Sequence, residues 1–397
     1  MTENNSVTVK GFRFASMIAG IKKKPLDDLG IIVSDRPCTA AGVFTKNMVK
    51  AAPVLVSQKH LKSAKLFGVV CNSGCANAVT GSTGMKDAVN MTKILADGIG
   101  CKASEILVAS TGVIGQFLPM SKLEDGIPKL IKGLNDSPDP FSKAIMTTDT
   151  VPKRASKRLK IGGKDVTIWG TSKGAGMLHP NMATMLAFIV TDAAIPKLLL
   201  KSLLKEAVDV TFNCISVDGD TSTNDSVFLL ANGAAGNAPL KKGTADYRNF
   251  ASALREVSLS LSEQIILDAE GATVLAEIKV EKGRNRKEAV SVARTIAKSF
   301  LVKTALYGRD ANWGRIICAA GYSGVKVDPE KMELYFGEHC AYRKGAPVGD
   351  MEEKLTAEMK KKRVDLRLVL NQGKATASYL FCDISREYVT INADYRS

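Results

Sequence analysis

The sequence predicts a layered protein of the α/β or α+β class. Short runs of β-forming apolar residues alternate loosely with segments whose apolar residues recur at helical spacing, and several strand-like runs follow one another directly. Hydrophobic residues make up 45% of the 397 residues, and the mean hydropathy is close to zero, which is typical of a soluble globular protein with a sizeable core. This mixture argues against an all-α or an all-β protein. We find no internal repeat and no linker that separates two domains.

The first half of the chain is expected to start with strands and then to alternate between strands and helices. Its strand-like runs are rich in Val, Ile and Phe. Helical spacing indicates one helix at 85–99, which ends at Gly100, and another at 121–134, which ends before Pro138. A hairpin is expected around Gly162. The expected strands are 7–13, 30–35, 40–45 (alternatively a tight loop), 53–57, 65–71, 105–110 and 166–170.

The second half opens with an unbroken apolar run of strand length at 185–190. Pro196 is expected to begin a helix that reaches about Thr211, because proline suits the first turn of a helix. A long helix is expected over 246–267 and a mostly helical segment over 288–307, followed by a polar break and a short helix. The further strands are expected at 214–217, 227–231, 274–280, 325–327, 364–370 and 375–381.

The charge balance points to anionic partners of small size. The net charge is +15, but its lysines and arginines are scattered and few aromatic residues lie among them, so the stacking platform of a nucleic-acid binder is missing. We interpret the short basic runs at 22–24 and 360–363 as solvated faces. The positive field would still attract carboxylates and coenzyme phosphates.

Cysteine and histidine usage argues against a metal centre. Of the eight cysteines only Cys71 and Cys75 lie close together, and their spacing is not that of a zinc knuckle. The three histidines lie in no recognised catalytic or metal-binding motif; His179 is expected to pack in its loop. The spacing of the polar residues at 218–224 is similar to that of a cation loop, but the terminal Glu of an EF-hand is absent. We therefore expect no metal.

Thr184 lies between a glycine-rich segment and the apolar run of 185–190, directly after the small residue Ala183. A hydroxyl in this position suits a nucleophile that is released when the chain is cut just before it, because the new α-amine can serve as its base. The alternative is a glycine loop that simply leads into a core strand.

A second candidate segment lies where the strand at 105–110 runs into Thr111 and Gly112. Backbone N–H groups left free at the end of a strand can bind a phosphate or stabilise an oxyanion. Many strands end in such residues for reasons of turn geometry, so this pattern alone does not separate the two interpretations.

Two segments are highly specific in combination: Met-Ala-Thr-Met-Leu at 182–186 and Gly-Arg-Asp-Ala-Asn-Trp-Gly-Arg at 308–315. With them the chain resembles the ornithine acetyltransferases of arginine biosynthesis, also called bifunctional glutamate N-acetyltransferase/ornithine acetyltransferases. The resemblance covers nearly the whole length in the expected order. The matching stretches are 39–54, 72–78, 110–115, 144–153, 173–192, 218–225, 270–273, 301–315 and 391–396.

The resemblance implies a layered αββα sandwich, similar to the N-terminal-nucleophile hydrolases but with its own topology. It implies one catalytic unit over 1–397 that cuts itself between Ala183 and Thr184. The products would be an α chain of 1–183 and a β chain of 184–397, which stay associated as a heterotetramer or larger assembly. Thr184 would then take the acetyl group of N2-acetylornithine and pass it to glutamate in a ping-pong reaction.

The resemblance also implies the residues of the site and its partners. Thr184 would be the nucleophile, and Thr111 with Gly112 would form the oxyanion hole. No cofactor is implied, although acetyl-CoA is a possible co-substrate. We expect no nucleic-acid or membrane partner, and a cytoplasmic location, because residues 1–6 lack the features of a signal peptide. The implied substrate contacts are Thr147, Lys173, Thr184, Glu270, Asn392 and Ser397.

Two rival functions share some of these features. An autoprocessing aminopeptidase or amidohydrolase of similar architecture would use the same self-cleavage but pass the acyl group to water. A non-enzymatic nucleic-acid-binding protein would explain the net charge of +15. The segment 308–315 and the match at the C-terminus argue against the amidohydrolase. A salt-sensitive DNA- or RNA-binding assay would test the second rival, and we expect only weak nonspecific binding.

Overall fold

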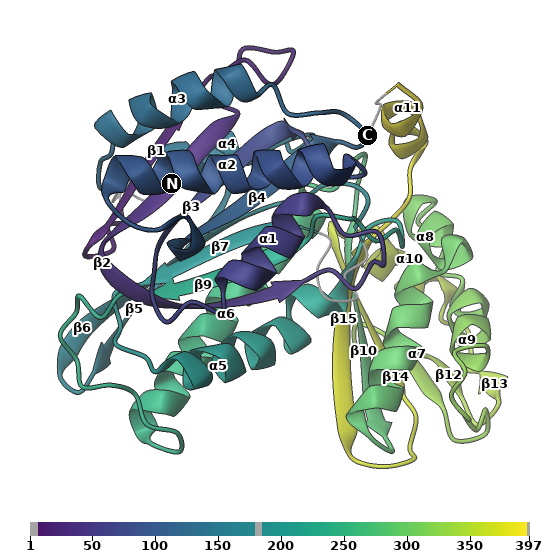
Figure 1. Cartoon of the computed structure of the whole chain (residues 1–397). Coiled ribbons are helices and arrows are strands. Elements are labelled where there is room, and N and C mark those ends of the chain that lie inside the picture. Colours follow the sequence, from purple (N-terminus) through teal and green to yellow (C-terminus); the bar gives the residue numbers. More distant parts are fainter. Residues whose placement is uncertain (1–6, 179–184, 395–397) are drawn as a thin grey trace.

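The chain folds around two β-sheets, each with its own helices (Figure 1). A computed structural model describes residues 7–178 and 185–394. The first sheet has the strand order β4-β3-β2-β9-β7-β6-β5, with β1 paired to β2 beside this row. Its strands are β1 (Phe12–Met17), β2 (Leu29–Phe44), β3 (Leu66–Cys75), β4 (Ile106–Val113), β5 (Lys153–Ile161), β6 (Lys164–Lys173), β7 (Leu186–Thr191) and β9 (Ser226–Ala231).

The long strand β2 turns the first sheet into a two-layered sandwich. Its first half pairs with β1 and β3, whereas its second half pairs with β9. The two halves of the sheet face each other across a shared apolar core. In that core Phe14 of β1 meets Trp169 of β6 edge to face, with ring centroids 5.4 Å apart.

Helices cover both outer faces of this sandwich. Helices α1 (Ala52–His60), α2 (Gly81–Ile99) and α3 (Met120–Lys132) pack against the layer of β1, β3 and β4. Helices α5 (Lys197–Val210) and α6 (Ala245–Leu267) pack against the layer of β5, β6, β7 and β9. The layers thus follow the order helices, sheet, sheet, helices, and the expected αββα sandwich is confirmed.

Three expectations for the sandwich are wrong in detail. The strand expected at 7–13 begins only at Phe12 and runs to Met17. Residues 53–57 belong to helix α1 and are not a strand. Pro53 lies in the first turn of this helix, where a missing N–H costs no intrahelical hydrogen bond, and Ala52, Val56 and His60 are buried along one face. The strands expected at 30–35 and 40–45 are not separate, because residues 30–35 and 40–44 all lie within β2, which ends at Phe44.

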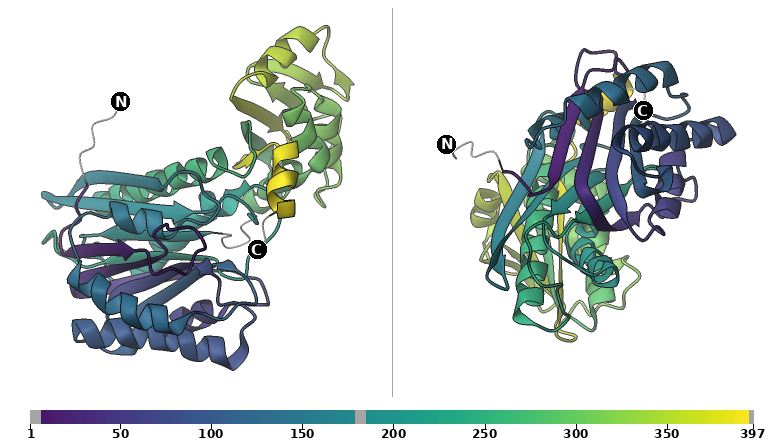
Figure 2. Two further views of the ribbon diagram at one scale, coloured as in Figure 1. Left: turned by 90° about the horizontal axis from the view of Figure 1, so that it is seen from above. Right: turned by 60° about the vertical axis from the view of Figure 1, so that its left-hand side comes forward.

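The second sheet comes almost wholly from the last third of the chain and forms a second body beside the sandwich (Figure 2). Its strand order is β13-β12-β11-β14-β10-β15-β8. The strands are β8 (Ile215–Ser216), β10 (Leu275–Gly283), β11 (Glu333–Phe336), β12 (His339–Arg343), β13 (Ala346–Pro347), β14 (Arg363–Val369) and β15 (Ala375–Cys382).

Four helices share the core of this second body. Ser299 divides the expected helical segment 288–307 into two helices, and its hydroxyl accepts a hydrogen bond from the N–H of Val302 at the start of the second. The strand expected at 325–327 is absent from this described region; these residues pack against the core as irregular chain. The helices are α7 (Arg286–Lys298), α8 (Phe300–Tyr307), α9 (Trp313–Gly321) and α10 (Glu352–Met359).

The last helix, α11 (Arg386–Asp394), was not expected from the sequence. It follows β15 and returns toward the sandwich (Figure 2). None of its residues is buried, but its Asn392 reaches the side chain of Glu270. Across residues 7–178 and 185–394, no helix has the length and apolar character needed to cross a membrane.

Candidate active site

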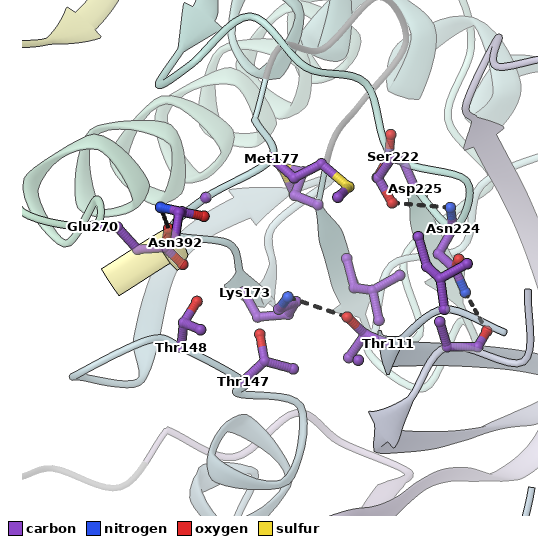
Figure 3. Close-up of a pocket in the computed structure, with 16 residues that line it drawn as sticks. Thr111, Thr147, Thr148, Lys173, Met177, Ser222, Asn224, Asp225, Glu270 and Asn392 are labelled. Carbon is purple, nitrogen blue, oxygen red and sulfur yellow. Dashed lines mark hydrogen bonds between the residues drawn. The ribbon is translucent and has the colours of Figure 1, made fainter. Parts of the chain in front are cut away.

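A pocket lies where β4 and β6 end and β7 begins (Figure 3). It gathers six of the positions expected from the sequence, contributed by β4, β6, α11 and two loops: Thr111, Gly112, Thr147, Lys173, Glu270 and Asn392. The remaining lining residues are Ala76, Ile114, Thr148, Gly176, Met177, Met185, Leu186, Ser222, Asn224 and Asp225.

Three predicted site residues lie outside the described residues: Ala183, Thr184 and Ser397. The same holds for His179. Met185, which follows Thr184 in the chain, is described and lines the pocket. The start of β7 is therefore part of the pocket wall.

The end of β6 meets the end of β4 through one hydrogen bond. The Nζ of Lys173 donates to the Oγ1 of Thr111 at 3.1 Å (Figure 3). Because the Thr111 oxygen accepts this bond, its own hydrogen is left to point at a second acceptor. Thr111 can therefore donate to an anion or a carbonyl oxygen in the pocket.

Gly112 stands at a place that tolerates no side chain. Its φ of +129° lies in a region that favours glycine. A Cβ at this position would lie 2.3 Å from the backbone carbon of Gly74 on the neighbouring strand. The close approach of β3 and β4 thus keeps the backbone of Gly112 bare at the pocket surface.

Lys173 carries its charge at a half-buried position in the pocket wall. Burial lowers the pKa of its ammonium, while the carboxylates of Asp149, Asp225 and Glu270 act in the opposite direction. An ammonium that is partly removed from water attracts a ligand carboxylate more strongly than an exposed lysine does.

Glu270 and Asn392 close the opposite side of the pocket. The Nδ2 of Asn392 donates to Oε2 of Glu270 at 2.8 Å (Figure 3). The backbone N–H of Glu270 donates to the carbonyl of Ala175 at 3.0 Å. A Cβ on Gly176 would lie 2.2 Å from Oε2 of Glu270, so the glycine-rich segment makes room for this carboxylate.

Sequence reasoning missed the acidic group directly before β9. Asp225 lines the pocket and is 2% exposed, and its Oδ2 has no hydrogen-bond partner among the described residues. Burial raises the pKa of Asp225 well above its usual range, although the Ser222 hydroxyl and Lys173 oppose this. The match at 218–225 was a signal that this loop belongs to the site, but nothing in the residue pattern singled out Asp225.

Asn224 ties this loop to the other side of the pocket. Its Nδ2 donates to the carbonyl of Ala76 at 2.5 Å and to that of Ser110 at 2.8 Å. Its backbone N–H donates to Oγ of Ser222 at 3.1 Å (Figure 3). In the described part of the chain, no group of three or more His, Cys, Asp or Glu side chains is arranged to hold a metal ion.

The pocket combines a half-buried ammonium, carboxyl groups, hydroxyls and bare backbone near strand ends. Such a set binds a small molecule with charges of both signs and offers donors for a developing oxyanion. The fold and the site together define an αββα-sandwich enzyme that acts on a small charged substrate.

A model of the ArgJ family matches residues 13–397, and the chain belongs to this family. Members of the family are acetyltransferases of arginine biosynthesis, active as ornithine acetyltransferase and glutamate N-acetyltransferase, and this chain is such an enzyme. The resemblance inferred from the sequence motifs is confirmed.

Relatives match over nearly the whole length. The arginine biosynthesis bifunctional protein ArgJ of Thermotoga neapolitana is 47% identical over 394 residues, which are 98% of this chain and 99% of the relative. That of Geobacter sulfurreducens is 47% identical over 393 residues, 98% of this chain and 100% of the relative. The crystal structure of the Bacillus halodurans protein is 44% identical, with a TM-score of 0.52 over 53% of this chain and 100% of that one.

Proposed function

We propose that this pocket transfers the acetyl group of N2-acetylornithine to glutamate through an acetyl ester on Thr184. One observation carries the proposal: six residues implied by the motifs, far apart in the sequence, line a single pocket together with Met185, the neighbour of Thr184.

The nucleophile arises by self-cleavage. The Thr184 hydroxyl attacks the carbonyl carbon of Ala183, the peptide C–N bond breaks as the Thr184 nitrogen takes up a proton, and water hydrolyses the resulting ester. The products are an α chain of 1–183 and a β chain of 184–397. The fold supports their continued association, because β6 and β7 lie on opposite sides of the cut and pair along six residues, from Ile168↔Thr191 to Lys173↔Leu186.

Acetyl transfer follows in two halves. The α-amine of Thr184, with an ordinary pKa of about 8, accepts the hydroxyl proton while the oxygen attacks the acetyl carbon of N2-acetylornithine, and ornithine leaves with that proton. The amino group of glutamate then attacks the acetyl ester, and Thr184 recovers its hydroxyl proton.

Thr111 and Gly112 stabilise the oxyanion of both tetrahedral intermediates. The Thr111 hydroxyl is polarised by Lys173, and the bare backbone of Gly112 adds a donor beside it. Preorganised donors of this kind act most strongly where charge develops in a buried site.

The two ends of the substrates meet opposite charges. Lys173 is the expected partner of the α-carboxylate that both amino acids share. Glu270 is suited to an ammonium group, and Asn392 orients it. Thr147 and Ser397 complete the substrate contacts.

The intact mass of the purified protein tests the nucleophile. The wild type should give two fragments divided between Ala183 and Thr184, and the Thr184→Ala variant should give one chain. A wild type that stays full length after prolonged incubation would contradict the mechanism.

Product analysis tests the acyl acceptor. Purified enzyme with N2-acetylornithine should form N-acetylglutamate when glutamate is present and little free acetate. Free acetate as the main product would instead indicate the amidohydrolase. Acetyl-CoA in place of N2-acetylornithine, with glutamate as acceptor, tests whether it serves as a second donor; we propose that it does, and absence of N-acetylglutamate would exclude it.

A further inference from the structure

Lys153, the first residue of β5, is buried in spite of its charge. Its side chain is 0% exposed, whereas that of Lys157 on the same strand is 48% exposed. The Nζ of Lys153 lies 2.6 Å from Oδ1 of Asp149 and 2.6 Å from Oδ2 of Asp268. One ammonium thus joins two carboxylates that are far apart in the sequence.

Asp149 connects two walls of the pocket. Its Oδ2 accepts the backbone N–H of Thr147 at 2.9 Å, and its Oδ1 accepts the backbone N–H of Gly174 at 2.7 Å. Burial by itself would raise the pKa of this carboxyl, but Lys153, Lys173 and the Gly174 N–H outweigh burial and lower it to about 2. Asp149 is therefore a fixed negative charge between the loop of Thr147 and the residue that follows Lys173.

Asp268 connects the segment of Glu270, which forms a third wall of the pocket, to the loop of Thr147. It follows the last residue of α6 and lies two residues before Glu270. Its carboxylate accepts the backbone N–H of Thr150 at 3.0 Å and also the Thr150 hydroxyl. Lys153 therefore reaches the loop of Thr147, the end of β6 and the segment of Glu270 through two carboxylates.

We propose that Lys153 is a positioning residue of the pocket, which holds the segments of Thr147, Lys173 and Glu270 in their relative places although it does not line the pocket itself. This inference rests on the proposed roles of those three residues in substrate binding. It also spans the proposed cut, because Asp149 and Lys153 belong to 1–183 and Asp268 belongs to 184–397.

The physical reason is the cost of an unpaired buried charge. A buried ion cluster contributes little net stability compared with an apolar core, but removal of one partner leaves the others uncompensated. Without Lys153, two carboxylates would remain close together in a buried region and would repel each other or draw in water. The backbone N–H groups that they hold would move with them.

Steady-state kinetics of Lys153→Met test this role, with Lys157→Met as the matched control. Lys157 also lies on β5 and pairs with Glu256 of α6 at 2.7 Å, but this pair is exposed. Both variants lose one positive charge on β5. Lys153→Met loses its two buried ion pairs, whereas Lys157→Met loses one exposed pair. Kinetics are measured on the cleaved fraction, which intact mass quantifies, and folding is checked by thermal unfolding.

We expect Lys153→Met to raise KM for N2-acetylornithine and for glutamate by about tenfold or more, because misplaced binding groups weaken substrate binding. Lys157→Met should keep wild-type KM values. A purely structural role would reduce the amount of active enzyme, and hence the apparent kcat, at unchanged KM. Unchanged KM in folded Lys153→Met would overturn the proposal.

If Lys153→Met does not fold, the Asp268→Asn variant tests whether the ion cluster positions the pocket. This isosteric change keeps the pair between Lys153 and Asp149 and weakens the link to Glu270, so KM should rise in the same direction but less. Wild-type KM values in Asp268→Asn would overturn the proposal. Thr147→Ala and Lys173→Ala, measured alongside, distinguish failure of the proposed binding site from failure of the proposed role of Lys153. If these two variants also leave KM unchanged, the proposed site is wrong. If they raise KM while Lys153→Met does not, only the role of Lys153 fails.

Discussion

The ammonium of Lys173 donates a 3.1 Å hydrogen bond to the hydroxyl of Thr111 and thereby joins the two layers of the sandwich at the pocket. Thr111 lies two residues before the end of β4 in one layer, and Lys173 is the last residue of β6 in the other. The contact directs the remaining hydrogen of Thr111 away from Lys173. In the proposed mechanism, this bond couples substrate binding by Lys173 to oxyanion stabilisation by Thr111.

Replacement of Thr111 should affect the chemical step. In Thr111→Val the shape is kept but the donor is lost, so kcat should fall by about 100- to 1000-fold with little change in KM. Thr111→Ser, which keeps the hydroxyl, should retain most of the activity. Initial rates of acetyl transfer provide the measurement. Equal activity of the Val and Ser variants would contradict the proposed role of Thr111 in the oxyanion hole.

Substrate binding should weaken in alkaline solution, because Lys173 loses its positive charge there. Burial lowers the pKa of its ammonium, so as pH rises the charge is lost earlier than from an ordinary lysine, whose pKa is about 10.4. KM for glutamate should rise over that range, and Lys173→Met should show a KM raised by about tenfold or more at neutral pH and no further alkaline rise. Lys160→Met, at an exposed position on β5, is the control. A parallel alkaline rise in Lys173→Met would assign the titration to another group.

The free energy of unfolding should decrease as pH rises, because the carboxyl group of Asp225 is buried. Burial raises the pKa of its carboxyl, so between the unfolded value of about 4 and the raised folded value the native state holds a proton that the unfolded chain has released. The free energy of unfolding therefore decreases with pH across this range. Asp225→Asn removes the effect, so the variant should gain stability relative to the wild type between pH 5 and pH 7.5.

Denaturant unfolding at these two pH values measures that difference. Processing is blocked in both proteins by Thr184→Ala, so that a single chain unfolds in each case. Identical pH dependence in the two proteins would show that Asp225 ionises normally in the folded state.

Asp149 should stabilise the fold above the pH at which carboxyl groups ordinarily ionise. Its folded pKa is lowered from 3.8 to about 2, which corresponds to about 2 kcal/mol in the free energy of unfolding. This contribution is complete above pH 4 and is lost as pH falls from about 4 to about 2. Asp149→Asn should be less stable at neutral pH and should lose less stability on acidification. Acid titration of the unfolding free energy checks both, and an equally steep acid loss in the variant would contradict the assignment.

Much of the local structure followed from the residue pattern. The apolar run at 185–190, the helical spacing at 246–267 and the hairpin around Gly162 all correspond to elements of the fold. The pattern failed at 53–57, where two valines favoured a strand and burial of one helix face decided otherwise. It also missed α11, which has no buried face and so leaves little trace in hydrophobic periodicity.

The sequence by itself determined the class of fold, the family and the candidate residues of the site, because periodicity and motifs are local properties of the chain. The tertiary structure alone decided that Thr111, Lys173, Glu270 and Asn392 share one pocket. It also decided that Lys153, which begins a basic strand whose middle residues 156–158 are exposed, is buried between Asp149 and Asp268. Burial and pairing of charges depend on which distant segments pack together, and no pattern within a short stretch of residues contains that information.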